Sequence, residues 1–345
     1  MERLTEEQLR TDPEVLLNNF KRTKDFLVAI DTDGCITDNM NGKQILIFHP
    51  QFMEFYNLWA IESYFREVAE YYNLFSIERG CNRFIAISLI LKALSIREDV
   101  KEKLIAENIE LPSIKFVDDF INFTKENKLG LGNPSLEKYI SLNPTIYQLY
   151  KLLGWSEAVN RTFPYISTKI SPFENVDKCL KLIAENSDVI VVSKTPYIDL
   201  VNYWESQGIS KYVQVIAGQE MGSKGHHINV VKEVGDYLDD EVLMLGDGNG
   251  DLKAVKENNG LFYPINPGSE QDDWNKFPES FRVFLQKKYK GIYEDKLIKR
   301  FKSTLLSVPT WEKQDYNHIE AYREKQDIRV NLYRRFNPEG RLFIL

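Results

Sequence analysis

Four apolar segments of this sequence are each followed by residues that could take part in chemistry. In chain order, these residues are Asp31-Thr32-Asp33-Gly34, then Ser193-Lys194-Thr195-Pro196, then a loop that reaches Lys224, and finally Asp247 to Asp251. In an open parallel sheet the carboxyl ends of the strands carry the ligand site, because loops and helix N-termini converge there. We therefore expect these polar residues to meet at one edge of a sheet.

The carboxylates of this set need a cation if they lie together. Two carboxylates about 4 Å apart repel by about 1 kcal/mol in water and by about 4 kcal/mol at an effective dielectric of 20. Ligands that are all oxygen favour a hard metal ion, and Mg²⁺ is the simplest choice for an ion that also holds a phosphate group. A metal-bound carboxylate can attack phosphorus when the ion and Lys224 neutralise the phosphoryl oxygens. Asp33 could then protonate a leaving alkoxide and later deprotonate water.

Alternating strand and helix patterns predict the scaffold for these residues. Strands are expected at Phe26 to Ile30 and at DVIVVS, VQVIAG, EVLMLGD and LFYPI, with helices at 172–186, 196–208, 227–238 and 252–258. Apolar strands that alternate with helices are typical of a doubly wound parallel sheet with helices on both faces. The fold class expected is therefore α/β, with one Rossmann-like sheet.

The segment between the first strand and residue 170 has helical spacing and few strand signals, and it is unusually aromatic between Phe48 and Phe84. Packing between long helices explains this aromatic stripe better than ligand stacking does. The predicted organisation is thus a discontinuous α/β core at 1–40 and 171–270, an all-helical domain inserted at 41–170, and a helical or irregular C-terminal extension at 271–345.

The composition describes an acidic, ordinary globular chain of 345 residues, with a net charge of −7 and 28% charged residues. Its basic residues are scattered, so it lacks the positive stripe that binds nucleic acid, although a small anion could bind in a locally positive pocket. The three cysteines, Cys35, Cys81 and Cys179, form no paired motif. The sequence therefore predicts a chain without disulfides in a reducing compartment. No apolar stretch is long enough for a membrane span or a signal peptide, so a cytoplasmic location is expected.

The ordered set of motifs resembles the haloacid dehalogenase-like superfamily, specifically its phosphatase branch. The resemblance covers Phe26 to about Asn39 and about Pro172 to Pro267. It implies that Asp31 is the nucleophile that forms an aspartyl-phosphate and that Asp33 is the general acid/base. It also implies a helical cap between the first two motifs, which the superfamily uses for small phosphorylated metabolites.

The remaining motifs imply the other site residues. Ser193 matches the phosphate-binding hydroxyl, and Asp247 and Asp251 match the Mg²⁺ carboxylates, with the carbonyl of Asp33 as a further metal ligand. Lys224 is the first candidate for the lysine of the third motif, and Lys211 and Lys232 stay open as alternatives. A phosphomutase of the same superfamily and a catalytically retired binding scaffold remain alternative functions.

The cap residues that recognise the substrate are expected in the stretch Glu78-Arg79-Gly80-Cys81-Asn82-Arg83. Arg79 or Arg83 could meet an anionic part of the substrate. The alternative is that either arginine serves as a helix C-cap or a surface ion pair. His49-Pro50 is a further, weaker candidate.

Overall fold

The computed structural model describes residues 2–167 and 169–336. The chain divides into two compact units, and each is described by itself. We call Met1–Met40 with Thr168–Leu305 the sheet unit, and Asn41–Ser167 with Leu306–Leu345 the helical unit.

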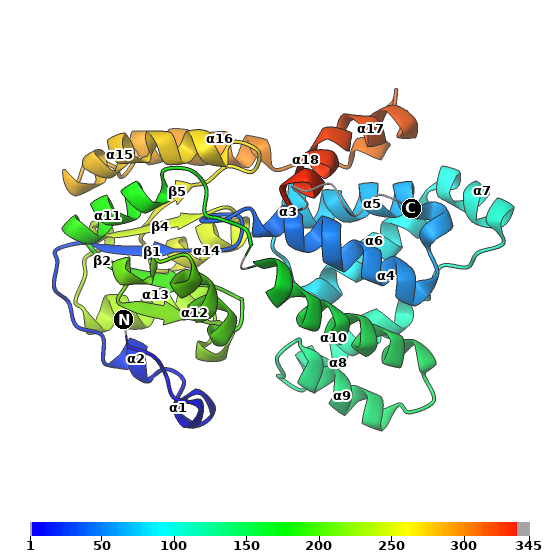
Figure 1. Ribbon diagram of the computed structural model, residues 1–345, viewed down its shortest axis with the longest axis horizontal. Helices are drawn as coiled ribbons and strands as arrows, with labels where there is room; N and C mark the ends of the chain where they lie inside the picture. The colour runs from blue at the N-terminus through cyan, green and yellow to red at the C-terminus, as the bar shows by residue number, and fades with distance from the viewer. Residues whose placement is uncertain (1, 168, 337–345) are drawn as a thin grey trace. The chain divides into compact units, whose positions relative to one another are not determined.

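The sheet unit is built on five parallel strands in the order β3-β2-β1-β4-β5 (Figure 1). The strands are β1 Leu27–Ile30, β2 Asp188–Val192, β3 Val215–Ala217, β4 Val242–Gly246 and β5 Leu261–Pro264. Every strand residue is buried, as expected for mostly apolar segments covered on both faces. Ile30 pairs with both Val191 and Leu245, so β1, β2 and β4 end at almost the same level.

Helices connect and cover these strands. They are α1 Glu6–Thr11, α2 Val15–Asn18, α11 Val176–Asn186, α12 Tyr197–Ser206, α13 Lys224–Val234, α14 Asn249–Glu257, α15 Glu270–Leu285 and α16 Ile292–Thr304, with short 3₁₀ turns at Ser210–Tyr212, Gln219–Met221 and Asp239–Glu241. Right-handed crossovers place α11 and α12 on one face of the sheet and α13 and α14 on the other, because the strand order reverses direction after β3. The doubly wound α/β fold predicted from the sequence is confirmed.

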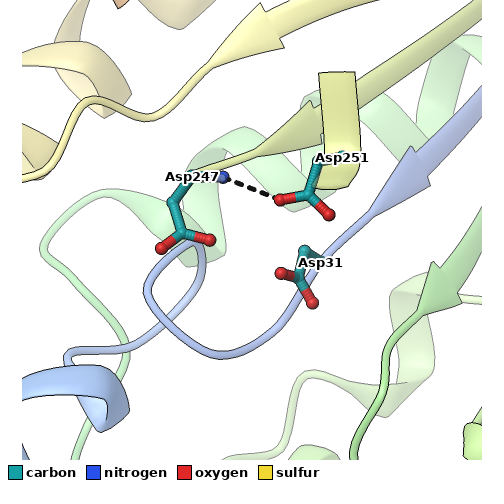
Figure 2. A group of neighbouring side chains, drawn as sticks. All are labelled: Asp31, Asp247 and Asp251. Carbon is teal, nitrogen blue, oxygen red and sulfur yellow. Dashed lines mark hydrogen bonds between the residues drawn. The ribbon is translucent and has the colours of Figure 1, made fainter. Parts of the chain in front are cut away.

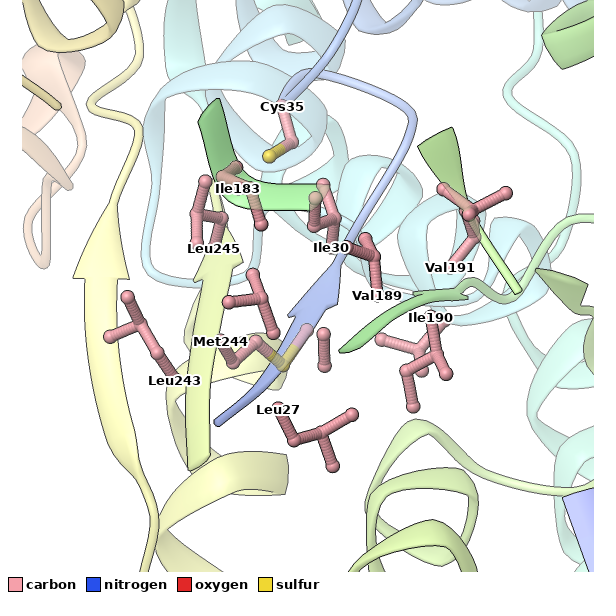
Figure 3. Packing of buried hydrophobic residues seen from close by; sticks show 14 of the residues in the cluster. Leu27, Ile30, Cys35, Ile183, Val189, Ile190, Val191, Leu243, Met244 and Leu245 are labelled. Carbon is pink, nitrogen blue, oxygen red and sulfur yellow. The ribbon is translucent and has the colours of Figure 1, made fainter. Parts of the chain in front are cut away.

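The core of the sheet unit lies between the strands and these helices. Figure 3 shows Leu27, Ile30, Val189, Leu243 and their neighbours packed together, with Cys35 beside them. Cys35 is fully buried, and this burial raises the pKa of its thiol well above the usual value, so it is a packing residue.

The helical unit contains no paired strands within its described residues. Its elements are α3 Asn39–Lys43, η1 Gln44–Phe48, α4 His49–Tyr56, η2 Trp59–Ile61, α5 Glu62–Glu70, η3 Tyr71–Phe75, α6 Arg83–Ile96, α7 Glu98–Glu107, α8 Lys115–Glu126, α9 Asn133–Leu142, α10 Tyr147–Ser167, η7 Thr310–Glu312, α17 His318–Glu324 and α18 Gln326–Phe336 (Figure 1). Segments η1 and η3 are π-helical.

The aromatic stripe of the sequence forms the core of the helical unit. Phe52 stacks on Tyr56 and Phe65 and meets Trp155 edge-on. All four belong to one buried apolar cluster, so the interpretation of the stripe as core packing is confirmed.

The C-terminal part of the chain is shared between the two units. Helices α15 and α16 belong to the sheet unit, where α15 packs against α11 and α16 against β5. From Leu306 onward the chain belongs to the helical unit, where Leu306 forms a β-bridge with Ser76. Across residues 2–167 and 169–336, none of the helices combines the length and the apolar character needed to cross a bilayer.

Candidate active site

The loop after β1 brings the first two aspartates to the carboxyl edge of the sheet. Asp31 continues the strand, since its amide donates to Leu245 O at 3.0 Å. The chain then turns at Gly34, whose φ of 80° favours glycine, and the Gly34 amide donates to Thr37 O. Two buried tryptophans hold the turn: Nε1 of Trp204 donates to Thr32 Oγ1 at 3.0 Å, and Nε1 of Trp274 donates to Cys35 O at 2.8 Å. The loop that follows Asp31 is therefore held in place by side chains from α12 and α15.

The turn between β4 and α14 places Asp247 and Asp251 beside Asp31. Oδ2 of Asp251 accepts the backbone amides of Asp247 at 3.2 Å and Gly248 at 3.1 Å, which caps the helix and points its other oxygen into the site (Figure 2). Gly246 makes this close approach possible, because a Cβ at that position would lie 2.4 Å from Cβ of Asp251.

Lys224 reaches the same carboxylates from α13. Its Nζ lies 2.6 Å from Asp31 Oδ2 and 2.6 Å from Asp251 Oδ1. The expected helix at 227–238 was placed too late, because Ser223 caps α13 by accepting the His226 amide and so puts Lys224 in the first turn.

The two other lysines considered for the third motif lie elsewhere. Nζ of Lys232 donates to Asp239 Oδ1 and to Asn258 O, whereas Nζ of Lys211 lies over the ring of Tyr212. Among these three lysines, Lys224 is the one that contacts Asp31.

The three carboxylates form a buried, negatively charged cluster. Asp31, Asp247 and Asp251 are each at most 5% exposed, and one oxygen from each lies within 4.8 Å of the others (Figure 2). Burial, together with the charges of Asp251 and Asp247, raises the pKa of Asp31 to about 8, against the opposing effect of Lys224. Burial alone would lower the pKa of Lys224, but the charges of Asp251 and Asp31 outweigh it and raise that pKa.

The geometry and the charge of this cluster fit a divalent cation. Three ionised carboxylates beside one ammonium leave an excess of two negative charges in a buried place. Such an excess is costly unless a cation or protons compensate for it. The available donor atoms are all carboxylate oxygens, which are the ligands that Mg²⁺ prefers.

Asp33 is not part of the carboxylate cluster, and it is held by two side chains to which the sequence analysis assigns no role. Thr195 Oγ1 donates to Asp33 Oδ2 at 2.9 Å, and Asn39 Nδ2 donates to Asp33 Oδ1 at 3.1 Å. Thr195 lies in the loop that begins directly after β2, and this position was the available signal in the sequence. Nothing in the sequence around Asn39 pointed to this contact.

Ser193 directly follows β2, the neighbour of β1. Its amide donates to Ala217 O at 3.0 Å, and its Oγ accepts the amide of Thr195 at 3.2 Å. The hydroxyl is thus oriented by the loop that also holds Asp33, and its own proton is left to donate to a ligand.

Arg79 and Arg83 both belong to the helical unit. Arg79 is buried, and its Nη1 donates to the carbonyl of Leu74 at 2.9 Å. Arg83 begins α6, and its Nη1 contacts Ser156 and Asn160. The two arginines therefore lie in the helical unit, whereas the six expected catalytic and metal residues lie in the sheet unit: Asp31, Asp33, Ser193, Lys224, Asp247 and Asp251.

Comparisons with known proteins find similarity at the level of solved structures, while no protein-family model and no curated protein sequence matches the chain. A haloacid dehalogenase-like family hydrolase from Xanthomonas campestris matches with 14% identity and a TM-score of 0.41, covering 77% of this chain and 94% of that one. A putative phosphatase from Clostridium difficile matches with 16% identity and a TM-score of 0.38, covering 76% and 99%.

A HAD-superfamily hydrolase of subfamily IA from Geobacter sulfurreducens PCA matches with 11% identity and a TM-score of 0.37, covering 69% of this chain and 86% of that one. Two of these three proteins are described as members of the superfamily that the ordered motifs of this chain resemble.

Proposed function

We propose that this protein is a Mg²⁺-dependent phosphohydrolase that removes a phosphate group from a small metabolite through an aspartyl-phosphate on Asp31. The observation that carries the proposal is the cluster in which Lys224 lies 2.6 Å from both Asp31 and Asp251, with Asp247 beside them. A buried cluster of this kind is typical of a functional site, because it costs folding stability unless a ligand compensates for its charge.

Asp31, Asp247 and Asp251 are the residues that would hold the ion. A bound Mg²⁺ would supply positive charge that favours the ionised form of Asp31 and neutralises the phosphoryl oxygens. Lys224 adds a fixed positive charge at the same place, and its two ion pairs keep the ammonium oriented. Ser193 Oγ–H is available to donate to a third phosphoryl oxygen.

In the first half of the reaction, the carboxylate of Asp31 attacks phosphorus, and the bond between phosphorus and the leaving oxygen breaks. Asp33 gives its proton to the leaving alkoxide, which departs as an alcohol. In the second half, Asp33 takes a proton from water, and the resulting hydroxide attacks phosphorus. The acyl-phosphate bond then breaks, and inorganic phosphate and free Asp31 are released.

The contacts of Asp33 suit this change of role. Thr195 Oγ1–H and Asn39 Nδ2–H each hold one oxygen of its carboxylate, so the side chain stays in one orientation in both halves of the reaction.

The test is turnover of p-nitrophenyl phosphate by the purified full chain. We expect activity in Mg²⁺ that EDTA removes and fresh Mg²⁺ restores. Asp31→Asn should lower kcat by at least about 10⁴-fold, because an amide cannot form the acyl-phosphate. Asp177→Asn, which changes an exposed aspartate on α11, is the matched control and should leave kcat unchanged. Turnover of Asp31→Asn within tenfold of the wild type would contradict the mechanism.

A further inference from the structure

A small cavity in the helical unit is lined by polar side chains that the proposed reaction does not use. Its volume is about 10 Å³, which is room for about one oxygen-sized group. The polar lining comes from Gln44, His49, Asn73 and Arg83, and the apolar lining includes Phe48 and Trp155. Two of these residues, His49 and Arg83, stand in the stretches that the sequence suggests for ligand recognition.

Two buried polar atoms at this cavity have no hydrogen-bond partner within the described part of the chain. They are Oε1 of Gln44, whose side chain is 7% exposed, and Nδ1 of His49, which is 2% exposed. Nδ2 of Asn73 faces Nε2 of His49 at 3.5 Å, so Nε2 is the acceptor and the ring proton lies on Nδ1. The cavity therefore offers one unused acceptor and one unused N–H donor, each of which costs about 1–3 kcal/mol when left unpaired.

Arg83 brings a positive charge to the same cavity. Its Nη1 donates to the carbonyl and hydroxyl of Ser156 and to Asn160 Oδ1, all of which are neutral acceptors. Its guanidinium also lies over the ring of Phe48 at 5.0 Å. No carboxylate in residues 2–167 or 169–336 forms an ion pair with it, although burial lowers its pKa to about 10. At neutral pH, Arg83 is thus a charged group without a counter-ion.

Other charges around the cavity keep it receptive to an anion. Burial lowers the pKa of His49 well below its usual value, and the positive charges of Arg66 and Arg329 act in the same direction. The imidazole is therefore neutral and acts as a hydrogen-bond donor only through Nδ1. Glu70, which lies on α5, is already paired with Arg329 at 2.7 Å and does not neutralise Arg83.

The backbone around the cavity is also unusual. Gln44 and Phe48 lie on the π-helical segment η1, and Asn73 lies on the second π-helical segment, η3. Such turns are rare and occur frequently at functional sites. Both π-helical segments of the helical unit contribute to this one cavity.

We propose that this cavity is a binding site for a small hydroxylated anion. One hydroxyl of the ligand enters the cavity, donates its proton to Gln44 Oε1 and accepts the Nδ1–H of His49. A single hydroxyl group can satisfy both unpartnered atoms because it is a donor and an acceptor at once. The anionic group of the same ligand pairs with the guanidinium of Arg83. This site belongs to the helical unit, whereas the aspartate cluster belongs to the sheet unit, and its test does not depend on phosphoryl transfer.

The test measures the binding of three two-carbon compounds to the full chain. Tryptophan fluorescence reports the binding, since Trp155 lines the cavity. Glycolate carries both the hydroxyl and the charge, acetate lacks the hydroxyl, and ethylene glycol lacks the charge. We expect saturable binding of glycolate, with acetate and ethylene glycol at least tenfold weaker. Trp155→Phe should remove the fluorescence response and so assign it to this cavity.

Two variants locate the binding site. Arg83→Gln removes the cation, and Gln44→Glu places a carboxylate beside it, which repels an anion and itself pairs with Arg83. Each should weaken glycolate binding at least tenfold. Lys151→Gln, which removes a cation that lies over Tyr56 and Tyr147 in the same unit, should leave binding unchanged. If Arg83→Gln lowers Tm strongly, Gln44→Glu carries the test.

Three results would overturn the proposal. One is the absence of saturable glycolate binding. Another is equal binding of glycolate and ethylene glycol, which would mean that the cavity holds an ordered water or any neutral hydroxyl only. The third is glycolate binding that Gln44→Glu does not weaken.

The hydroxylated anion could be part of the substrate or a separate effector. Inhibition of p-nitrophenyl phosphate turnover distinguishes them, and this arm alone depends on the proposed function. Competitive inhibition by glycolate supports a substrate group, whereas a change in kcat without competition supports an effector. Both results support the site, and a protein that is inactive towards every phosphate ester would still show the binding.

Discussion

Asp31 and Asp188 are buried carboxylates at opposite ends of the strands of one sheet. Asp31 lies where the strands end, which we call the carboxyl edge, and Asp188 lies where they begin, which we call the amino edge. At the carboxyl edge, Asp31 faces two further carboxylates and one lysine. At the amino edge, Asp188 accepts hydrogen bonds from the amides of Thr23 and Lys24, from Thr23 Oγ1, from Tyr237 OH and from Gln214 Nε2. One edge thus concentrates acceptors, and the other supplies donors.

The two environments move the two pKa values in opposite directions. Burial and neighbouring carboxylates raise the pKa of Asp31. Burial acts in the same direction on Asp188, but hydrogen bonds from Thr23, Tyr237 and Lys24 outweigh it and lower its pKa. The difference shows which carboxylate stabilises the folded chain and which one does not. Asp188 stabilises the folded chain through its donors, whereas Asp31 is one of three buried carboxylates that repel one another.

The largest expected effect on stability is therefore at Asp188. Asp188→Asn replaces an acceptor by an amide group that faces backbone N–H donors, so it should lower the free energy of unfolding by about 3 kcal/mol. Asp31→Asn, measured in EDTA, should change it by less than about 1 kcal/mol, because one of three repelling carboxylates is removed. Urea unfolding followed by circular dichroism measures both.

Turnover should show the reverse order for the same two variants. Asp188→Asn should keep kcat within about threefold of the wild type at temperatures where it is folded, since its contacts lie at the amino edge. If Asp31→Asn were the more destabilising variant, the distinction between the two edges would be wrong.

The carboxyl edge was predictable from the sequence because its residues directly follow apolar strands. Asp31, Asp247 and Asp251 occur within a few residues of such segments, and parallel strands that end at one level must bring them together. Lys224 was predictable as well, although α13 begins three residues before the expected helix because Ser223 caps it.

The amino edge and the cavity of the helical unit were not predictable in this way. The donors to Asp188 come from segments before three different strands, β1, β3 and β4, and no short motif links them. The cavity joins Gln44, Asn73 and Arg83, which are far apart in the sequence, through two π-helical segments that apolar spacing does not reveal. In both places the pairing depends on tertiary contacts rather than on local pattern.

Gly246 allows the approach of Asp251, and a substitution there tests whether the carboxyl edge needs its close spacing. The Cβ of Gly246→Ala would lie 2.4 Å from Cβ of Asp251, so one of the two residues must move. We expect the free energy of unfolding to fall by about 2 kcal/mol and kcat/KM to fall about 10²-fold, because Asp251 is displaced from Lys224. Gly130→Ala is the matched control, since a Cβ there meets nothing within 4 Å. Equal effects of the two substitutions would show that the spacing of the cluster is not needed.

The smallest expected effect is the pH dependence of the stability that Asp188 contributes. An aspartate in the unfolded chain has a pKa of about 3.9, and the donors at the amino edge hold the pKa of folded Asp188 below its usual value. The folded state therefore binds this proton less readily than the unfolded state does. The carboxylate stabilises the fold above about pH 4, and that contribution is lost as the pH falls through the lower, folded pKa.

Asp188→Asn cannot titrate at this position, so the difference in unfolding free energy between wild type and variant should be largest near neutral pH and shrink below about pH 4. Urea unfolding of both proteins at intervals of one pH unit measures it. A difference that stays constant down to about pH 3 would mean that the amide variant loses packing rather than charge-assisted hydrogen bonds, and that the two edges of the sheet differ less than their contacts indicate.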